Sequence, residues 1–193
     1  MTYYHPYSTR LMRFIIISDL HGSAEAFQEA VHAFKAERAD YFIICGDYLY
    51  HGPRNSLPIG YEPKDLAPLL NEYKEVIIGI RGNCDSEVDQ MLIDFPMMAD
   101  YAIVFHAARR CFITHGHIFN ENHLPCLSAG DVFISGHTHV PLLKCKDGLI
   151  FVNPGSTTIP KALSKPGYAL MDEEHIELKT LSGHETFSSL KFT

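Results

Sequence analysis

Five times along this chain, a short apolar run ends in a glycine-flanked block that carries Asp, Asn or His. The blocks are DLHG at 19–22, GD at 46–47, GNCD at 82–85, HGH at 115–117 and GHTH at 136–139. Short apolar runs bounded by turn residues are typical of buried strands, and glycine permits the tight turns at their ends. A chain that repeats this plan is expected to fold into sheets with a polar crevice at the strand ends.

The first half of the chain predicts alternating strands and helices. Buried strands are expected at 13–18, 41–45 and 76–80. Ser23 is a suitable N-cap for a helix to about residue 37, whose Phe27, Val31 and Phe34 recur at helical spacing and face the sheet. A second, shorter helix is expected over 63–72. Strand, helix and strand in such close succession predict parallel pairing.

The second half is rich in short strands with close reversals. Strand candidates lie at 102–105, 111–114, 132–135, 142–146, 149–153, 169–172 and 175–181. Asp147-Gly148 is a hairpin-turn signal, so this half is expected to be mostly antiparallel. The pattern as a whole predicts an α/β (α+β) fold of two sheets packed face to face with helices outside. We expect one domain over residues 1–193, in which residues 1–12 form a flexible N-terminal extension.

Composition excludes several classes of protein. Of the 193 residues, 46% are apolar and 20% charged, as in globular domains, and no apolar run approaches the ~18 residues of a membrane span. The formal charge of −7 repels nucleic-acid phosphates, so neither a membrane nor a nucleic acid is an expected partner. Five cysteines without a CxxC pair favour the reduced cytoplasm over a disulfide framework.

The polar blocks together supply one kind of chemistry. Each block alone is more often a turn, a cap or a loop histidine. As an ordered set they offer imidazole, carboxylate and amide oxygen, a mixed ligand set that suits Mn, Fe or Zn. Asp19 and His21 are two residues apart, as are His137 and His139, so each pair can direct two donors to one point. The sequence therefore predicts a metal site at the strand ends.

The five blocks in this order resemble the calcineurin-like metallophosphoesterase superfamily. The stretches DYLYHGPRN (47–55), RGNCDSEVDQ (81–90) and NPGSTTIP (153–160) are similar to small bacterial phosphodiesterases of that superfamily, and the resemblance runs from about residue 13 to 181. It implies the metallophosphoesterase fold, a four-layer αββα sandwich of two mixed sheets, with two divalent ions. Mn²⁺ is the expected metal, with Zn²⁺, Fe²⁺ and Ni²⁺ as alternatives.

The same resemblance assigns the ligands. One ion would be held by Asp19, His21 and His139, the other by Asn83, His115 and His137, and Asp47 would bridge the two. Adjacent ions ~3.5–4 Å apart need such a shared group, and a hydroxide between them is the expected nucleophile.

Further residues are expected to serve catalysis beside Asp47 and Asn83. Arg54 is a candidate phosphate clamp, because a guanidinium binds phosphate oxygens bidentately, or else a surface arginine. Cys84 stands where many relatives carry histidine, and a thiol is a poorer proton donor. Asp85 either orients its neighbours or caps the following helix, and we favour the cap. His117 is expected beside the metal ligands.

The expected function is hydrolysis of small phosphodiesters by a dinuclear metal centre. The same site is compatible with a phosphomonoesterase or a cyclic-nucleotide phosphodiesterase. A non-catalytic scaffold like the retromer subunit of this superfamily is a further alternative, disfavoured because all seven ligand positions carry competent side chains. The expected partner is a small phosphoester substrate, and the resemblance also suggests a homodimer.

Overall fold

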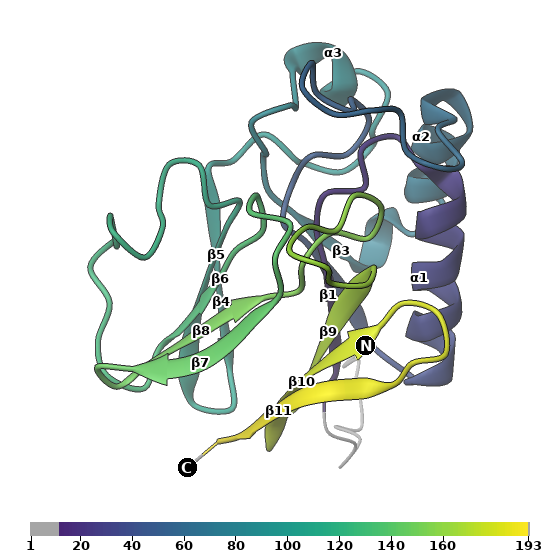
Figure 1. The fold of residues 1–193 in the computed structure, drawn as a ribbon. Coiled ribbons are helices and arrows are strands. Elements are labelled where there is room, and N and C mark those ends of the chain that lie inside the picture. The colour runs from purple at the N-terminus through teal and green to yellow at the C-terminus, as the bar shows by residue number, and fades with distance from the viewer. Residues whose placement is uncertain (1–11, 193) are drawn as a thin grey trace, which may run out of the picture.

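The computed structural model describes residues 12–192, in which two mixed sheets face each other (Figure 1). The six-stranded sheet has the order β11-β10-β9-β1-β2-β3, and the five-stranded sheet has the order β4-β5-β6-β8-β7. The strands of the first are β1 (Phe14–Ile17), β2 (Tyr41–Ile44), β3 (Ile77–Gly79), β9 (Gly167–Met171), β10 (His175–Thr180) and β11 (Thr186–Lys191). Those of the second are β4 (Tyr101–His106), β5 (Arg109–Thr114), β6 (Val132–Ile134), β7 (Leu142–Lys146) and β8 (Leu149–Asn153). The predicted pair of mixed sheets is confirmed.

Strand β1 shows how the layers are built. Its side chains alternate, so Phe14 and Ile16 join the core between the two sheets while Ile15 and Ile17 join the core under the helices. All four are at most 1% exposed. Burial of each such side chain stabilises the fold by about 1.5–3 kcal/mol. A continuous apolar run is what a strand covered on both faces requires.

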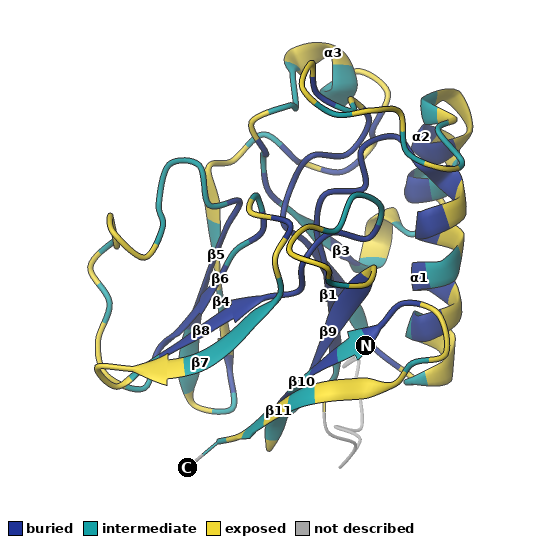
Figure 2. Ribbon diagram, viewed as in Figure 1, coloured by how far each residue is buried: buried dark blue, intermediate teal, exposed yellow. Residues whose placement is uncertain are grey.

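Helices α1 (Ala24–Ala36) and α2 (Pro63–Asn71) cover the outer face of the six-stranded sheet (Figure 1). Ser23 caps α1 as predicted, because its hydroxyl accepts a hydrogen bond of 3.1 Å from the amide of Ala26. Figure 2 shows one buried and one exposed side along α1. The short elements are the 3₁₀ turn Lys74–Val76 and helix α3 (Glu87–Gln90), which begins with a capping box of Ser86 and Asp89. No helix in the described part of the chain is long and apolar enough to span a membrane.

A loop covers part of the outer face of the five-stranded sheet, and Ile103 and Phe105 of β4 on the same face are exposed. Phe112, Phe133 and Phe151 form a cluster on that face, and Phe119 and Leu127 from segment 115–131 pack against it. This segment follows β5, crosses the outer face of the sheet and forms the fourth layer of the sandwich.

Pairing in the second half differs in part from the prediction. The edge pairs β4–β5 and β7–β8 are antiparallel, and the Asp147-Gly148 turn has the two positive φ angles, 52° and 78°, of a hairpin turn. The central pairs β5–β6 and β6–β8 are parallel. The loop after β5 returns the chain to the end of the sheet where β5 began, and strand β7, antiparallel to β8, does the same between β6 and β8. Strand β11 was not predicted, and its sequence TFSSLK carries too few apolar residues to signal a strand. The predicted extension lies outside the described residues apart from Met12.

Candidate metal centre

The predicted ligands follow strands of both sheets. Asp19, Asp47 and Asn83 come after the parallel strands β1, β2 and β3, whose carboxyl ends share one edge. His115 and His137 come after the parallel strands β5 and β6 of the other sheet. The polar crevice expected from the sequence therefore lies where the ends of the two sheets meet.

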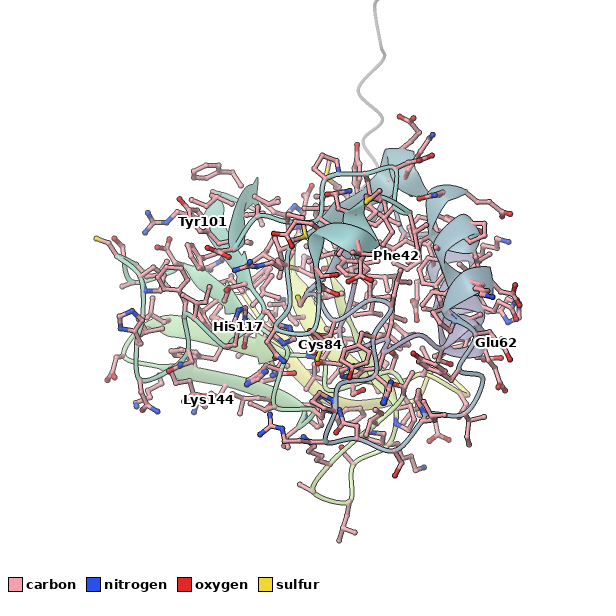
Figure 3. The ribbon with its side chains drawn as sticks, turned by 90° about the horizontal axis from the view of Figure 1, so that it is seen from above. Phe42, Glu62, Cys84, Tyr101, His117 and Lys144 are labelled. Atoms are coloured by element: carbon pink, nitrogen blue, oxygen red, sulfur yellow. The ribbon has the colours of Figure 1, made fainter. Side chains whose placement is uncertain are left out.

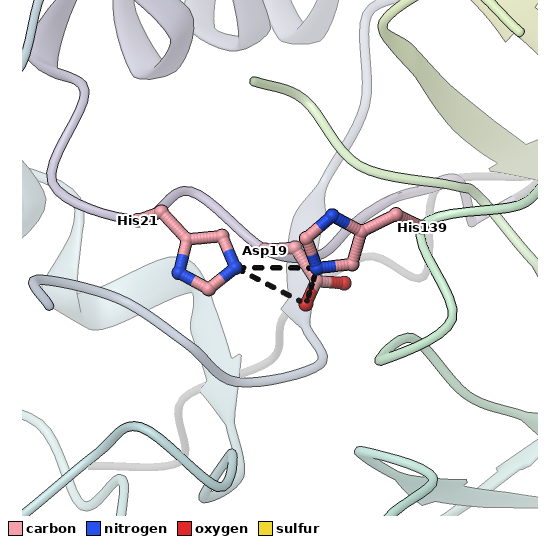
Figure 4. A group of neighbouring side chains, drawn as sticks. All are labelled: Asp19, His21 and His139. Atoms are coloured by element: carbon pink, nitrogen blue, oxygen red, sulfur yellow. Dashed lines mark hydrogen bonds and ion pairs between the residues drawn. The ribbon is translucent and has the colours of Figure 1, made fainter. Parts of the chain in front are cut away.

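Asp19, His21 and His139 form the first donor group (Figure 4). Oδ1 of Asp19 lies 3.2 Å from Nε2 of His139 and 3.7 Å from Nε2 of His21. The two Nε2 atoms lie 3.3 Å apart. All three side chains are buried. Two residues of this group come from the six-stranded sheet and one from the five-stranded sheet.

Asn83, His115 and His137 form the second donor group. Nε2 of His115 lies 3.0 Å from Oδ1 of Asn83 and 3.2 Å from Nδ1 of His137. Asn83 belongs to the six-stranded sheet and both histidines follow strands of the other sheet. Each donor group is thus complete only when the two sheets are packed together.

Asp47 lies between the two groups. Its Oδ2 is 3.7 Å from Nε2 of His21 and 3.5 Å from Nε2 of His115. One carboxylate oxygen therefore faces both groups at similar distances, which is the position that a bridging ligand needs.

The outer nitrogens of three imidazoles fix which atom faces inward. Nδ1 of His21, His115 and His139 each lies next to a main-chain carbonyl, of Tyr50 (2.8 Å), Cys45 (2.6 Å) and Ile159 (2.6 Å) respectively. A carbonyl oxygen only accepts, so each Nδ1 donates and each neutral ring presents the lone pair of Nε2 to the centre. Lone pairs that face each other at 3.3 Å, as in His21 and His139, repel unless a cation or proton lies between them.

The two carboxylates are oriented in the same manner. Oδ2 of Asp19 accepts a hydrogen bond from the amide of His137 (3.1 Å), and Oδ1 of Asp47 accepts one from the amide of Cys84 (2.8 Å). This leaves Oδ1 of Asp19 buried without a hydrogen-bond donor among the described residues. A buried carboxylate oxygen that faces only imidazole nitrogens fits a metal ligand.

When no metal is bound, a proton can occupy the first donor group. Burial acts to lower the pKa of His139, but the carboxylate of Asp19, whose Oδ1 can accept from Nε2 once that nitrogen is protonated, outweighs burial and raises it. Burial likewise acts to raise the pKa of Asp19, while His139 and His115 hold it well below its usual value. A proton between these residues takes the place that a cation would take.

Five of the seven donors have a strained backbone. Asp19, His21, Asp47, His137 and His139 all have positive φ angles, between 45° and 66°. Each such residue costs of order 1–3 kcal/mol relative to relaxed backbone, and this strain clusters at functional sites. Sequence reasoning missed this feature, because only the glycines beside these residues signal that the turns are tight.

Asp85 holds two of the loops together. Its carboxylate accepts hydrogen bonds from the amides of Asp47 (2.8 Å), Tyr48 (2.8 Å) and Gly82 (2.7 Å). The prediction that it caps the following helix is wrong, because Ser86 and Asp89 cap α3. Burial and the charge of Asp47 raise the pKa of Asp85 to about 7 against the three amides, which lower it.

Gly82 and Gly136 permit the close approach of these loops. A Cβ on Gly82 would lie 2.1 Å from Oδ1 of Asp47, and a Cβ on Gly136 would lie 1.8 Å from Oγ of Ser18. No other residue type fits at either position without moving a ligand loop.

A cleft of about 360 Å³ opens over the centre. Its walls are formed by His21, Asp47, Gly52, Pro53, Arg54, Asn55, Asn83, Cys84, His137, His139 and Lys161. Arg54 and Lys161 are exposed and Cys84 is partly buried. Arg54 was predicted at the site. Lys161 was missed, although it directly follows the NPGSTTIP stretch.

Cys84 and His117 lie near the middle of the molecule when it is seen from above (Figure 3). Burial, with the charge of Asp47 next, raises the pKa of Cys84 to about 12, so the side chain is a thiol at neutral pH. The ring of His117 packs edge-on against that of His115, with centroids 5.3 Å apart, so His117 lies beside the donor groups as predicted.

A calcineurin-like phosphoesterase superfamily model matches residues 12–175, and the chain belongs to this superfamily. The chain is 41% identical over 172 residues to the phosphodiesterase YfcE of Escherichia coli K12, covering 89% of this chain and 94% of that protein. The solved structure of YfcE, a phosphoesterase from E. coli, superposes with a TM-score of 0.92 at 38% identity, over 94% of this chain and all of that one. Vacuolar Protein Sorting 29 from Cryptosporidium parvum shares the fold, with a TM-score of 0.62 at 19% identity over 95% and 98% of the two chains. The family and fold implied by the sequence motifs are confirmed.

Proposed function

We propose that this chain is a phosphodiesterase that hydrolyses small phosphodiesters with two divalent ions. Its relationship to YfcE supports the reaction class. The observation that carries the two-ion proposal is the position of Oδ2 of Asp47 between the two donor groups. Asp19, His21 and His139 would hold one ion, and Asn83, His115 and His137 the other. When bound, such ions acidify a bridging water toward pKa ~7 and neutralise phosphoryl charge.

The chain's own residues then orient the substrate and the ligands. Arg54 binds a non-bridging phosphoryl oxygen from the wall of the cleft. Asp85 and the amide of Cys84 keep the carboxylate of Asp47 in position. Cys84 is protonated but weakly acidic, so it gives little help to a departing alkoxide. We therefore propose a preference for diesters with acidic leaving groups.

The metal and the cellular setting are also proposed. The mixed nitrogen and oxygen donors accept Mn²⁺, our first choice, as well as Zn²⁺, Fe²⁺ or Ni²⁺. All five cysteines are free, which supports a cytoplasmic location. A homodimer stays a prediction.

The test is metal-dependent hydrolysis of bis-p-nitrophenyl phosphate. Protein stripped with a chelator is expected to be inactive and to regain activity with Mn²⁺. Asp47→Asn keeps the shape of the side chain but removes the shared charge, so kcat/KM should fall by about 100-fold or more. Activity that survives chelation, or that Asp47→Asn retains, would contradict the proposal. Metal binding without any hydrolysis would favour the scaffold alternative.

A further inference from the structure

Lys161 is a cation in the cleft that the proposed chemistry does not use. It lines the cleft together with Arg54 and five of the seven metal-donor residues. Among residues 12–192, no carboxylate forms an ion pair with Lys161 or with Arg54. Both side chains are exposed, so their charges are available to a molecule in the cleft.

The backbone of Lys161 is anchored to the first donor group. Its amide donates to the carbonyl of His139 (3.0 Å), and the carbonyl of Ile159 accepts the hydrogen bond from Nδ1 of the same histidine (2.6 Å). Oγ of Ser156 donates to the carbonyl of Asp19 (2.9 Å). The start of the Lys161 side chain is therefore fixed relative to the metal donors.

Arg54 is carried by a different loop. A Cβ on Gly52 would lie 3.1 Å from Sγ of Cys84, and Nδ2 of Asn55 closes the loop on the carbonyl of His51 (2.8 Å). Arg54 thus enters the cleft from a loop packed on Cys84, and Lys161 from the segment that holds His139. Two cations on separate loops can each bind a different anionic group of one substrate.

The charged side chains around the cleft favour a substrate with one sign of charge. Asp47 is the only carboxylate that lines it among the described residues, and it is 2% exposed and directed at the histidines. The charged side chains exposed in the cleft are Arg54 and Lys161. This environment disfavours a cationic headgroup and favours an anionic one. The cleft volume lies within the range of small-molecule sites.

We propose that Lys161 is a specificity-determining residue that binds a second phosphoryl group of the substrate. The preferred substrates are then small diesters that carry an additional phosphoryl group away from the scissile one. This inference rests on the proposed function, with Arg54 assigned to the scissile phosphoryl group.

Two chromogenic diesters that differ by one phosphoryl group test the inference. These are the p-nitrophenyl ester of thymidine 5′-phosphate and the same ester with a 3′-phosphate. The Mn²⁺-loaded wild type should prefer the 3′-phosphorylated ester. In Lys161→Gln this preference should fall about tenfold, through KM, while kcat/KM for the other ester stays within about twofold. Lys165→Gln, an exposed lysine of the same loop outside the cleft, should change neither ester.

The competing outcomes are distinct. Arg54→Gln should lower kcat/KM for both esters alike. Equal loss on both esters in Lys161→Gln, or no preference in the wild type, would overturn the inference. If the wild type hydrolyses neither ester, binding alone tests the inference, and the proposed function fails only if bis-p-nitrophenyl phosphate is not hydrolysed either. Calorimetry on Mn²⁺-loaded protein should then show thymidine 3′,5′-bisphosphate binding more tightly than thymidine 5′-monophosphate, and Lys161→Gln should remove that difference. Equal affinities in the wild type would reject the subsite.

Discussion

At the scale of single residues, the centre depends on which atom each side chain turns inward. The Nδ1–H groups of three imidazoles donate hydrogen bonds to main-chain carbonyls, and one oxygen of each of the two carboxylates accepts a hydrogen bond from a main-chain amide. The backbone therefore selects the donor atoms, and the side chains alone would not do so. Substitutions near the centre affect either the proposed metal-donor atoms or the protonation of the leaving group. These two effects can be measured separately.

Cys84→His tests the proton supply. An imidazole with an ordinary pKa near 6.5 is a far better proton donor at neutral pH than a thiol whose pKa is about 12. We expect kcat to rise by about tenfold or more for a diester with an alkyl leaving group, and to change little for bis-p-nitrophenyl phosphate. The measurement is steady-state kinetics on both substrates with Mn²⁺. Unchanged kcat on the alkyl ester would show that leaving-group protonation does not involve this position.

Sequence reasoning identified the residues that the structure brings together as proposed donors, but it missed the residues that hold them in place. Asp19, His21 and His137 stand at the ends of apolar runs, where the pattern alone places them at one edge. Lys161 could not be placed in this way, because the path of its loop depends on hydrogen bonds to Asp19 and His139, which are distant in sequence. Asp85 was misread because a carboxylate before a short helix also matches a cap, and only its contacts with Asp47 and Gly82 distinguish the two roles.

At the scale of elements, the strand ends and glycine turns set the spacing of the donors. The strands that lead to the donor residues were predictable, because the runs before these turns are largely apolar. The parallel direction of β6 was not, since short strands with close turns favour antiparallel pairing and the loop after β5 returns across the sheet instead. Packing of Phe119 and Leu127 on the outer aromatic cluster supports this crossing.

Gly136→Ala tests the spacing of the turns. The added Cβ would lie 2.7 Å from Cβ of Ser18 and 2.9 Å from Oδ2 of Asp19, so the loop with His137 must move. We expect a loss of about 1–3 kcal/mol in the free energy of unfolding by urea and at least about tenfold weaker Mn²⁺ binding by calorimetry. Gly183→Ala is the control, because its positive φ of 81° adds strain but its Cβ has room. That variant should lose about 1 kcal/mol and keep its Mn²⁺ affinity. Wild-type affinity in Gly136→Ala would refute the close-approach argument.

At the scale of the whole molecule, the centre joins the two sheets. Each donor group takes ligands from both, so a bound ion adds a connection across the interface that the apolar core already forms. Ligands that bind only the folded state stabilise it by mass action. If the proposed ions bind there, metal content and global stability are linked.

Removal of metal and a lowering of pH should both reduce the stabilisation that bound Mn²⁺ gives to the fold. Because the folded-state pKa of His139 is raised, its proton is bound more tightly and must leave before metal binds, so Mn²⁺ affinity should fall as pH drops from 8 toward 5. We expect Mn²⁺ at 100 times its dissociation constant to stabilise the protein by about 2.7 kcal/mol at pH 8, and the increase in Tm to shrink toward pH 5. Calorimetric scans with and without chelator measure this effect. Asp47→Asn should show a smaller Tm increase at every pH, and an increase independent of pH in the wild type would contradict the ligand assignment.

The division of ligands between the two sheets also bears on the order of events during biosynthesis. Residues up to the turn after β3 supply only Asp19, His21, Asp47 and Asn83, so both proposed ions would lack ligands until the turn after β6 has left the ribosome and docked. A nascent chain can therefore collapse its first β-α-β unit without capturing a cation. In the proposed two-ion centre, we therefore expect metal loading to be a late step that reports the docking of the two halves of the polypeptide.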